Sequence, residues 1–244
     1  MERVGTLLVV LALTGLSQAD VINYTSQSRT VGGGAGSACE NGVSDSVAAS
    51  DFGPFTETIT VAGDFASTQA TQSSVLCGTS IHAQGSTSAG GAGCVGTAYA
   101  GGYSDFSVVF ELDESRSYSL QASFGNYASY SISGPSLNLS AGGFKKIVND
   151  TLDLDGTLAA GTYTITLDAN SNSVFDLFDN GSFDFVLRLE GDPDLDGSGS
   201  VDGTDLGLLL AQWGPCATCC PADLNADGMV DAADLGLLLG AWTP

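Results

Sequence analysis

The C-terminal part of the chain contains one twelve-residue pattern twice, and no other feature of the sequence limits its fold more. The pattern occupies residues 194–205 and again residues 223–234, with Asp at the first, ninth and twelfth positions of both copies. The two copies are offset by about 29 residues, a period typical of a repeated supersecondary unit. Each copy is followed at once by Leu-Gly-Leu-Leu-Leu, so the repeated unit is predicted to be a loop followed by a helix.

The spacing of oxygen-bearing residues in both copies is that of a calcium loop. Ca²⁺ takes six to eight oxygen ligands, which a twelve-residue loop supplies from positions 1, 3, 5, 7, 9 and 12, the seventh through its backbone carbonyl. Position 6 needs a sharp turn, and it is Gly199 in the first loop and Gly228 in the second. We therefore expect two calcium ions. The predicted ligands are Asp194, Asp196, Ser198, Ser200, Asp202 and Asp205 in the first loop, and Asp223, Asn225, Asp227, Met229, Asp231 and Asp234 in the second.

The residues after each loop have the spacing of a short amphipathic helix. Apolar residues at positions i, i+3, i+4 and i+7 predict a stripe that faces the core. Position 8 of the loops is Val201 and Val230, and two such valines are expected to pair in a short strand bridge. The predicted core stripe is Leu206, Leu209, Leu210 and Trp213 in the first copy, and Leu235, Leu238, Leu239 and Trp242 in the second.

Two loop-then-helix units with Asp at position 12 and no entering helix resemble a type I dockerin over residues 191–244. The resemblance implies a small all-α, EF-hand-like calcium domain that docks secreted proteins onto cohesin domains. The pairs Gly203-Thr204 and Ala232-Ala233 stand where dockerins often have Ser-Thr, and the helices lack the usual basic pair. The implied partner is therefore a cohesin-like or other extracellular or cell-envelope protein. The candidate contact residues are Thr204, Leu208, Leu210, Leu237 and Leu239.

Residues 20–190 alternate apolar and polar side chains in short runs, which is the period of half-buried antiparallel strands. Regular strands separated by turn residues favour an antiparallel β-sandwich, of which a jelly-roll is one form. The Gly-rich stretch 32–101 is expected to contain strands with long loops. No Pro/Thr linker separates residues 20–190 from residues 191–244, which predicts a stiff join. The clearest strands are 106–110, 118–124, 163–167 and 183–189.

Several features predict export of the chain. Residues 1–19 read as a secretory signal peptide, with an apolar run too short to span a membrane and a small-residue cleavage site before Asp20. No later stretch is apolar enough for a membrane span, so the mature protein is expected outside the cell or on its surface. Cysteines fit that oxidising route. They are Cys39, Cys77, Cys94, Cys216, Cys219 and Cys220, and the last three favour a structural disulfide over a zinc site.

The formal net charge of −22 argues against nucleic acid and anionic membranes as partners. Residues 191–244 contain nine Asp and no Lys, Arg or Glu. Without calcium this acidic segment should repel itself and stay partly unfolded, so that metal binding and folding are coupled.

The sequence leaves the function of residues 20–190 open among three classes. The chain is a calcium-dependent docking protein, a polysaccharide-degrading or carbohydrate-binding protein that carries a dockerin, or a structural surface protein with a calcium-rigidified module. A glycoside hydrolase would need two carboxylates about 5–10 Å apart, and His82 is a lone histidine without a Gly-x-Ser-x-Gly or His-Glu-x-x-His motif. An enzyme is therefore the less favoured class. Candidate sugar-stacking residues are Tyr99, Tyr103, Tyr127 and Tyr130, and candidate carboxylates are Glu57, Glu111, Asp113, Glu114, Asp150, Asp153, Asp155, Asp176 and Asp179.

Overall fold

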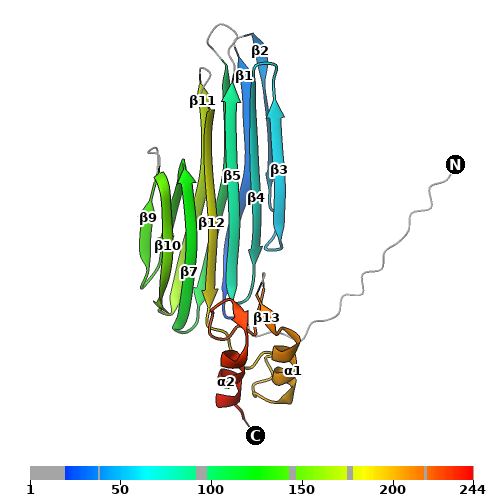
Figure 1. Cartoon of the computed structure of the whole chain (residues 1–244), viewed down its shortest axis with the longest axis vertical. Helices are drawn as coiled ribbons and strands as arrows, with labels where there is room; N and C mark the ends of the chain where they lie inside the picture. Colours follow the sequence, from blue (N-terminus) through cyan, green and yellow to red (C-terminus); the bar gives the residue numbers. More distant parts are fainter. Residues whose placement is uncertain are drawn as a thin grey trace, which may run out of the picture.

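The computed structural model describes residues 20–37, 39–91, 98–142, 147–174, 178–216 and 219–243. The expected signal peptide, Cys94 and Asp176 lie outside these residues. Two six-stranded antiparallel sheets pack face to face, and two short helices lie at one end of them (Figure 1). The predicted antiparallel β-sandwich is thus confirmed, while a jelly-roll order stays a prediction.

All strand pairings in the two large sheets are antiparallel. Sheet A has the order β2 (Glu40–Ala48), β1 (Asn23–Ser37), β6 (Tyr99–Leu112), β11 (Gly161–Val174), β8 (Ala128–Ser133) and β9 (Asn138–Ala141). Sheet B has the order β10 (Ile147–Leu158), β7 (Arg116–Asn126), β12 (Phe178–Leu189), β5 (Ser80–Gly91), β4 (Ala66–Leu76) and β3 (Phe55–Ala62).

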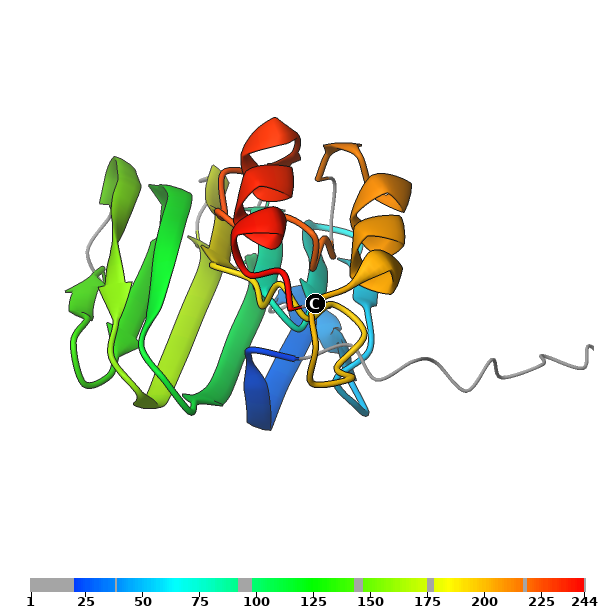
Figure 2. The same cartoon turned by 90° about the horizontal axis from the view of Figure 1, so that it is seen from below.

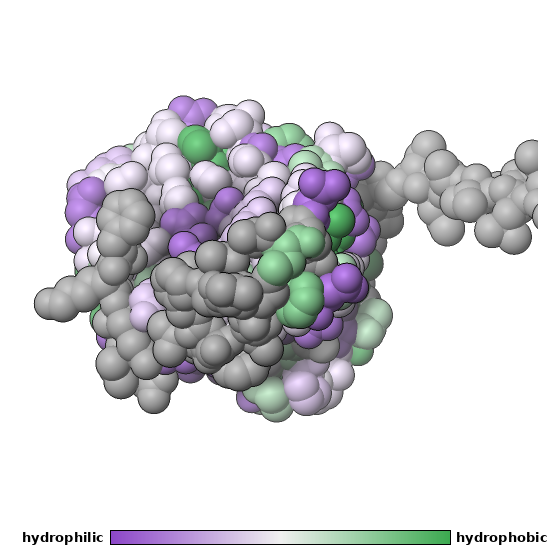
Figure 3. Space-filling model, turned by 90° about the horizontal axis from the view of Figure 1, so that it is seen from above, coloured by the Kyte–Doolittle hydropathy of each residue, from purple (hydrophilic) through white to green (hydrophobic). Residues whose placement is uncertain are grey.

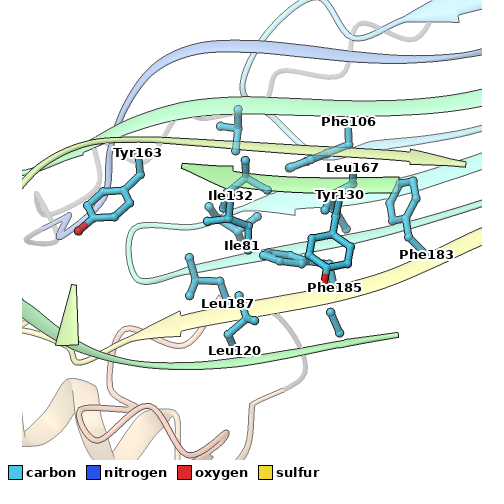
Figure 4. Packing of buried hydrophobic residues seen from close by; sticks show 14 of the residues in the cluster. Ile81, Phe106, Leu120, Tyr130, Ile132, Tyr163, Leu167, Phe183, Phe185 and Leu187 are labelled. Atoms are coloured by element: carbon cyan, nitrogen blue, oxygen red, sulfur yellow. The ribbon is translucent and has the colours of Figure 1, made fainter. Parts of the chain in front are cut away.

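The half of the sandwich nearer the helices has a core of large side chains. The four clearest predicted strands lie in β6, β7, β11 and β12, where buried and outward-facing residues alternate as the period of two requires. Phe106, Phe185 and Leu120 from both sheets meet between them (Figure 4). Tyr163 is fully buried, stacks on Phe110 with ring centroids 5.5 Å apart, and donates its hydroxyl to the Ala159 carbonyl. A buried tyrosine hydroxyl needs such a partner.

The other half of the sandwich is built largely from Gly, Ala, Ser and Thr. The Gly-rich segments lie inside β1, β5 and β6, and residues 63–65 and 77–79 suffice to connect β3, β4 and β5. Among the described residues of 32–101, the longest connection is 49–54, so the expected long loops are not found there. A Cβ on Gly33 would lie 2.6 Å from Thr68 Cγ2, and a Cβ on Gly102 would lie 2.6 Å from Thr68 Oγ1. The sheets approach too closely here for larger residues. Figure 3 shows that the described surface at this end mixes hydrophilic, intermediate and hydrophobic residues.

The C-terminal module, residues 191–243, covers one end of the sandwich (Figures 1 and 2). It contains α1 (Gly203–Ala211), α2 (Ala232–Gly240) and a bridge between β13 (Gly214–Pro215) and β14 (Met229–Val230). Two short helices are thus all that is shown of the predicted all-α domain. Asp202 and Asp231 cap the helices, each in a capping box with the Asp three residues later.

The predicted core stripe of the helices is only half correct. Leu209 and Leu238 are fully buried, and Leu206 and Leu235 pack partly against the same core. Leu195, Val201, Leu224 and Val230 from the loops fill the rest of that core, so two nine-residue helices need contribute little more. The other four predicted stripe residues are exposed, namely Leu210, Trp213, Leu239 and Trp242.

Two disulfides fix the connector between the helices. Cys216 pairs with Cys220, while Cys219 pairs with Cys77 at the end of β4 and so ties the module to the sandwich. The predicted structural disulfide in this cluster is confirmed, and the expected stiff join has a covalent basis. Cys39 is also disulfide-bonded.

Candidate metal centre

Loop 1, residues 194–205, folds around the carboxylates at its first and last positions. Asp194 accepts hydrogen bonds from the backbone N–H groups of Ser198 at 3.0 Å and Gly199 at 2.7 Å. Asp205 accepts from Asp196 N at 3.1 Å and from Asp202 N at 2.8 Å. Carboxylate oxygens of Asp194, Asp196 and Asp205 all lie within 4.8 Å of one another. Three of the predicted calcium ligands in loop 1 are therefore close enough together to share one ion.

Loop 2, residues 223–234, repeats the same hydrogen bonds at the same positions. Asp223 accepts from Asp227 N at 3.1 Å and from Gly228 N at 2.9 Å. Asp234 accepts from Asn225 N at 3.2 Å and from Asp231 N at 2.7 Å. Position 3 of this loop is the amide Asn225, whereas loop 1 has the carboxylate Asp196 at that position. The sequence repeat is thus also a structural repeat.

The backbone of both loops turns through positive φ at two positions. Gly199 has a φ of +87° and Gly228 a φ of +91°, which confirms the turn predicted at position 6. Position 4 is also left-handed, with +68° at Gly197 and +62° at Ala226. Sequence reasoning missed this second turn, because an alanine gives no signal for a conformation that costs side-chain-bearing residues about 1 kcal/mol or more.

Three of the four carboxylates at the ends of the loops are buried, and Asp194 is half-buried; the described part of the module offers none of them a cationic partner. Asp205 and Asp234 have no exposed surface, and Asp223 is 3 % exposed. Burial raises the pKa of Asp223 to about 6; the hydrogen bond from Gly228 N opposes this, and the charge of Asp234 adds to it. Burying unpaired charge is costly, so two carboxylates packed into one loop favour a divalent cation between them. Donor type, spacing and burial all fit Ca²⁺.

The remaining predicted ligands lie around the same loops. Asp202 and Asp231 each use one carboxylate oxygen to cap a helix, accepting from Thr204 N and Ala233 N at 2.7 Å. Ser198 Oγ lies 3.2 Å from the Ser200 carbonyl. In the second loop, Asp227 accepts from Met229 N at 2.9 Å and from the Asn225 amide at 2.8 Å.

The expected bridge between Val201 and Val230 is wrong. Val230 pairs with Gly214, the residue two places after Gln212, which caps α1. Val201 donates its N–H to Thr243 Oγ1 at 2.8 Å, and its carbonyl accepts from Thr243 N at 3.0 Å. Gly214 and Thr243 each follow a Trp in the repeat, so each loop pairs with the segment that follows the other loop's helix. The two loops therefore contact the segments that follow the two helices and do not pair directly with each other.

The predicted partner-contact residues divide into exposed and packed positions. Leu210 is 52 % exposed, Leu239 51 % and Leu237 43 %, and Thr204 is exposed as well. Leu208 is half-buried against the module core, which limits what it can offer a partner. Sequence reasoning missed other exposed apolar residues because it placed them in the core stripe or treated them as ligands. They are Trp213, Trp242 and Met229.

The candidate sugar-binding tyrosines are scattered. Tyr130 is buried and stacks on Phe124, whereas Tyr99 is 49 % exposed. Asp150 accepts a hydrogen bond from Tyr130, and the carboxylates Asp153 and Asp155 share its edge strand, β10. His82 points away from the core of sheet B, and burial lowers its pKa, with Arg188 adding to the effect. These residues therefore do not form one constellation.

Sequence reasoning missed a pair of carboxylates on sheet A. Asp105 and Asp168 lie directly opposite each other on β6 and β11, on the face away from the core. Burial raises the pKa of Asp105 to about 6, and the charge of Asp168 adds to it. The sequence gives no register between strands, so it gives no sign that these residues meet.

Comparison with known proteins yields no similarity on which to base a function. No family model matches the chain, and no characterised protein or solved structure is similar to it. Within the described residues, no helix is long and apolar enough to cross a membrane.

Proposed function

We propose that this chain is a secreted protein whose C-terminal module binds two calcium ions and docks the β-sandwich onto a cohesin-like or other extracellular or envelope protein. Calcium would be held by the six predicted positions of each loop. Its role there is structural, because it neutralises the buried carboxylates and orders the helices that carry the apolar surface residues. The resemblance to dockerins supports the docking role.

One observation carries the calcium proposal. The carboxylates at position 12, Asp205 and Asp234, are completely buried and are hydrogen-bonded by N–H donors of their own loops. A carboxylate in that position is stabilised by a bound cation far more than by solvent, which cannot reach it. That two loops offset by a repeat share the arrangement supports two calcium sites instead of one accidental acidic cluster.

The docking proposal rests on paired apolar residues at the free end of the module. Leu210 and Leu239 occupy the same repeat position and are each about half exposed. At a second shared position, Trp213 is 50 % and Trp242 38 % exposed. Exposed tryptophan side chains are typical anchors of protein interfaces, and the leucines add apolar surface. Because their helices begin at ligand residues of the loops, calcium binding and docking are expected to be coupled.

Calorimetry and affinity capture test the two parts of the proposal separately. Mature protein titrated with calcium should bind two ions, and the Asp205→Ala plus Asp234→Ala variant should bind none. Mature protein should then retain a partner from the extracellular and envelope fraction of its source in calcium but not in EGTA. The Leu210→Glu plus Leu239→Glu variant should bind calcium but lose that partner. The control variant Gln69→Glu, at an exposed position of β4, should keep it. Absence of calcium binding to the unmodified protein would refute the proposal.

A second candidate is a structural role for calcium, without docking. The disulfide between Cys77 and Cys219 favours it, because a module fixed covalently to the sandwich is suited to closing its end. In that case calcium would raise the melting temperature of the protein, and the Leu210→Glu plus Leu239→Glu variant would behave like the unmodified protein in every capture experiment.

A further inference from the structure

Loop 2 is attached to the sandwich by several contacts that involve its backbone. Ser119 Oγ on β7 donates to the carbonyl of Ala226 at 2.6 Å, and Gly191 N, just after β12, donates to the carbonyl of Leu224 at 3.1 Å. Directly before this loop, Cys219 is bonded to Cys77 of the sandwich. Position 4 of loop 2 is therefore held by the sandwich itself, and position 2 is held by Gly191, the first residue of the module after β12.

Loop 1 has no equivalent attachment in the described part of the chain. Its hydrogen bonds run within the loop and its helix, to Asp192 just before the loop, or to Thr243 at the end of the module. The nearest link to the sandwich is an ion pair of 3.7 Å between Arg116 and Asp192, which precedes the loop and is partly exposed. A partly exposed ion pair of this kind contributes little to the stability of the attachment.

The burial of matched positions shows the same difference. At position 4, Ala226 is 3 % exposed, whereas Gly197 is exposed to solvent. At position 6, a Cβ on Gly228 would lie 3.4 Å from Cζ of Arg188 of the sandwich, whereas a Cβ on Gly199 would meet nothing within 4 Å. The same loop pattern is thus packed against the sandwich at positions 4 and 6 in loop 2 and exposed to solvent at those positions in loop 1.

We propose that the two loops are unequal calcium sites, with loop 2 a tight site built into the joint and loop 1 a weaker site that responds to the calcium concentration. This inference rests on the proposed function. Each loop supplies four Asp side chains at ligand positions, so carboxylate number does not separate them. What separates them is preorganisation, because a loop whose backbone is already held loses less conformational entropy when it binds an ion.

The guanidinium of Arg188 on β12 lies beside position 6 of loop 2, where a Cβ on Gly228 would come within 3.4 Å of it. In the proposal, its positive charge offsets part of the repulsion among the loop 2 carboxylates when calcium is absent. Loading would start at loop 2, and only the filling of loop 1 would order the start of α1 and complete the docking surface.

Variants with one functional loop test the inequality by calorimetry on the full mature protein. Asp205→Ala leaves only loop 2 intact and Asp234→Ala only loop 1, and both remove the same position-12 carboxylate. The Asp205→Ala protein should bind one calcium ion at least tenfold more tightly than the Asp234→Ala protein. Adding Ser119→Ala to the Asp205→Ala protein should weaken its site several-fold, whereas Ser123→Ala on the same strand should not. Equal affinities, or tighter binding by the Asp234→Ala protein, would overturn the inference and leave the proposed function standing.

Hydrogen exchange of the unmodified protein in EGTA gives an independent answer if a position-12 variant fails to fold. Backbone amides in 223–234 should stay protected while those in 194–205 exchange quickly. Equal protection of the two loops, or faster exchange in loop 2, would contradict the inference. If the unmodified protein bound no calcium at all, the proposed function would fail first, so the two failures are distinguishable.

Discussion

Replacing Asp105 by Asn should stabilise the protein at neutral and alkaline pH. The Asp105 carboxyl lies opposite Asp168 in the register of β6 and β11, and like charges in directly opposed positions destabilise a sheet. Burial and that neighbour raise the pKa of Asp105 from 3.8 to about 6. Asn keeps the shape of the side chain but removes the charge that the folded state disfavours.

The magnitude and its pH dependence follow from that pKa. A rise of about two units corresponds to about 3 kcal/mol at 1.36 kcal/mol per unit, and partial exposure of the side chain reduces this to about 1–2 kcal/mol. Because the folded-state pKa is raised, ionisation destabilises the fold fully above pH 6. The penalty shrinks as the pH falls through 6 and disappears below the unfolded value of 3.8. At pH 5 about half of it remains.

Urea denaturation in saturating calcium measures this effect at pH 8 and pH 5. The Asp105→Asn protein should exceed the unmodified protein by about 1–2 kcal/mol at pH 8, and by about half as much at pH 5. Asp113→Asn in the exposed turn after β6 is the matched control and should change stability little at either pH. A destabilised Asp105→Asn protein, or a gain independent of pH, would show that the carboxyl is not held in an unfavourable charged state.

Four further variants test the module and its joint. Removing the disulfide with Cys77→Ser plus Cys219→Ser should lower the free energy of unfolding by about 3–5 kcal/mol, because the bond joins residues 142 positions apart. Denaturation followed by tryptophan fluorescence measures this loss of stability. Leu209→Ala should cost about 2–5 kcal/mol, whereas exposed Leu210→Ala should cost less than about 1 kcal/mol in the same assay and act only on partner capture. Ala226→Gly should raise stability in calcium by about 0.5–1 kcal/mol in thermal melts, since Ala226 holds a φ of +62° that glycine adopts without strain; a lower melting temperature would contradict this.

Sequence periodicity predicted the strands of the large core because their apolar residues are big enough to stand out. Phe106, Val108 and Phe110 alternate with the outward-facing Ser107 and Val109, and β6 buries all three. The strands around Gly33 and Gly102 carry no such signal, because two closely approaching sheets are filled there by small residues that also occur in loops. Long loops were therefore expected where long strands exist.

The repeated loops and their glycine turns at position 6 could be predicted because residue spacing is a local property of the chain. Their surroundings could not, since they depend on which distant segment packs against them. The predicted strand bridge between Val201 and Val230 is wrong for this reason. Gly214 pairs with Val230, and Thr243 bonds to Val201, so neither valine pairs with the other. The bond between Cys77 and Cys219 was equally beyond reach, as spacing does not determine disulfide connectivity.

The same reasoning explains how a symmetric sequence yields an asymmetric module. The two repeats make the same internal hydrogen bonds, so nothing in their own chemistry distinguishes them. Yet only one of them can follow Cys219, which is fixed to the end of β4, and that copy has its Ala226 carbonyl within reach of Ser119. In the described residues, loop 1 has no such contact and is open to solvent at Gly197 and Gly199. Under the proposed inequality, the held loop maintains the joint and the solvent-exposed loop senses calcium.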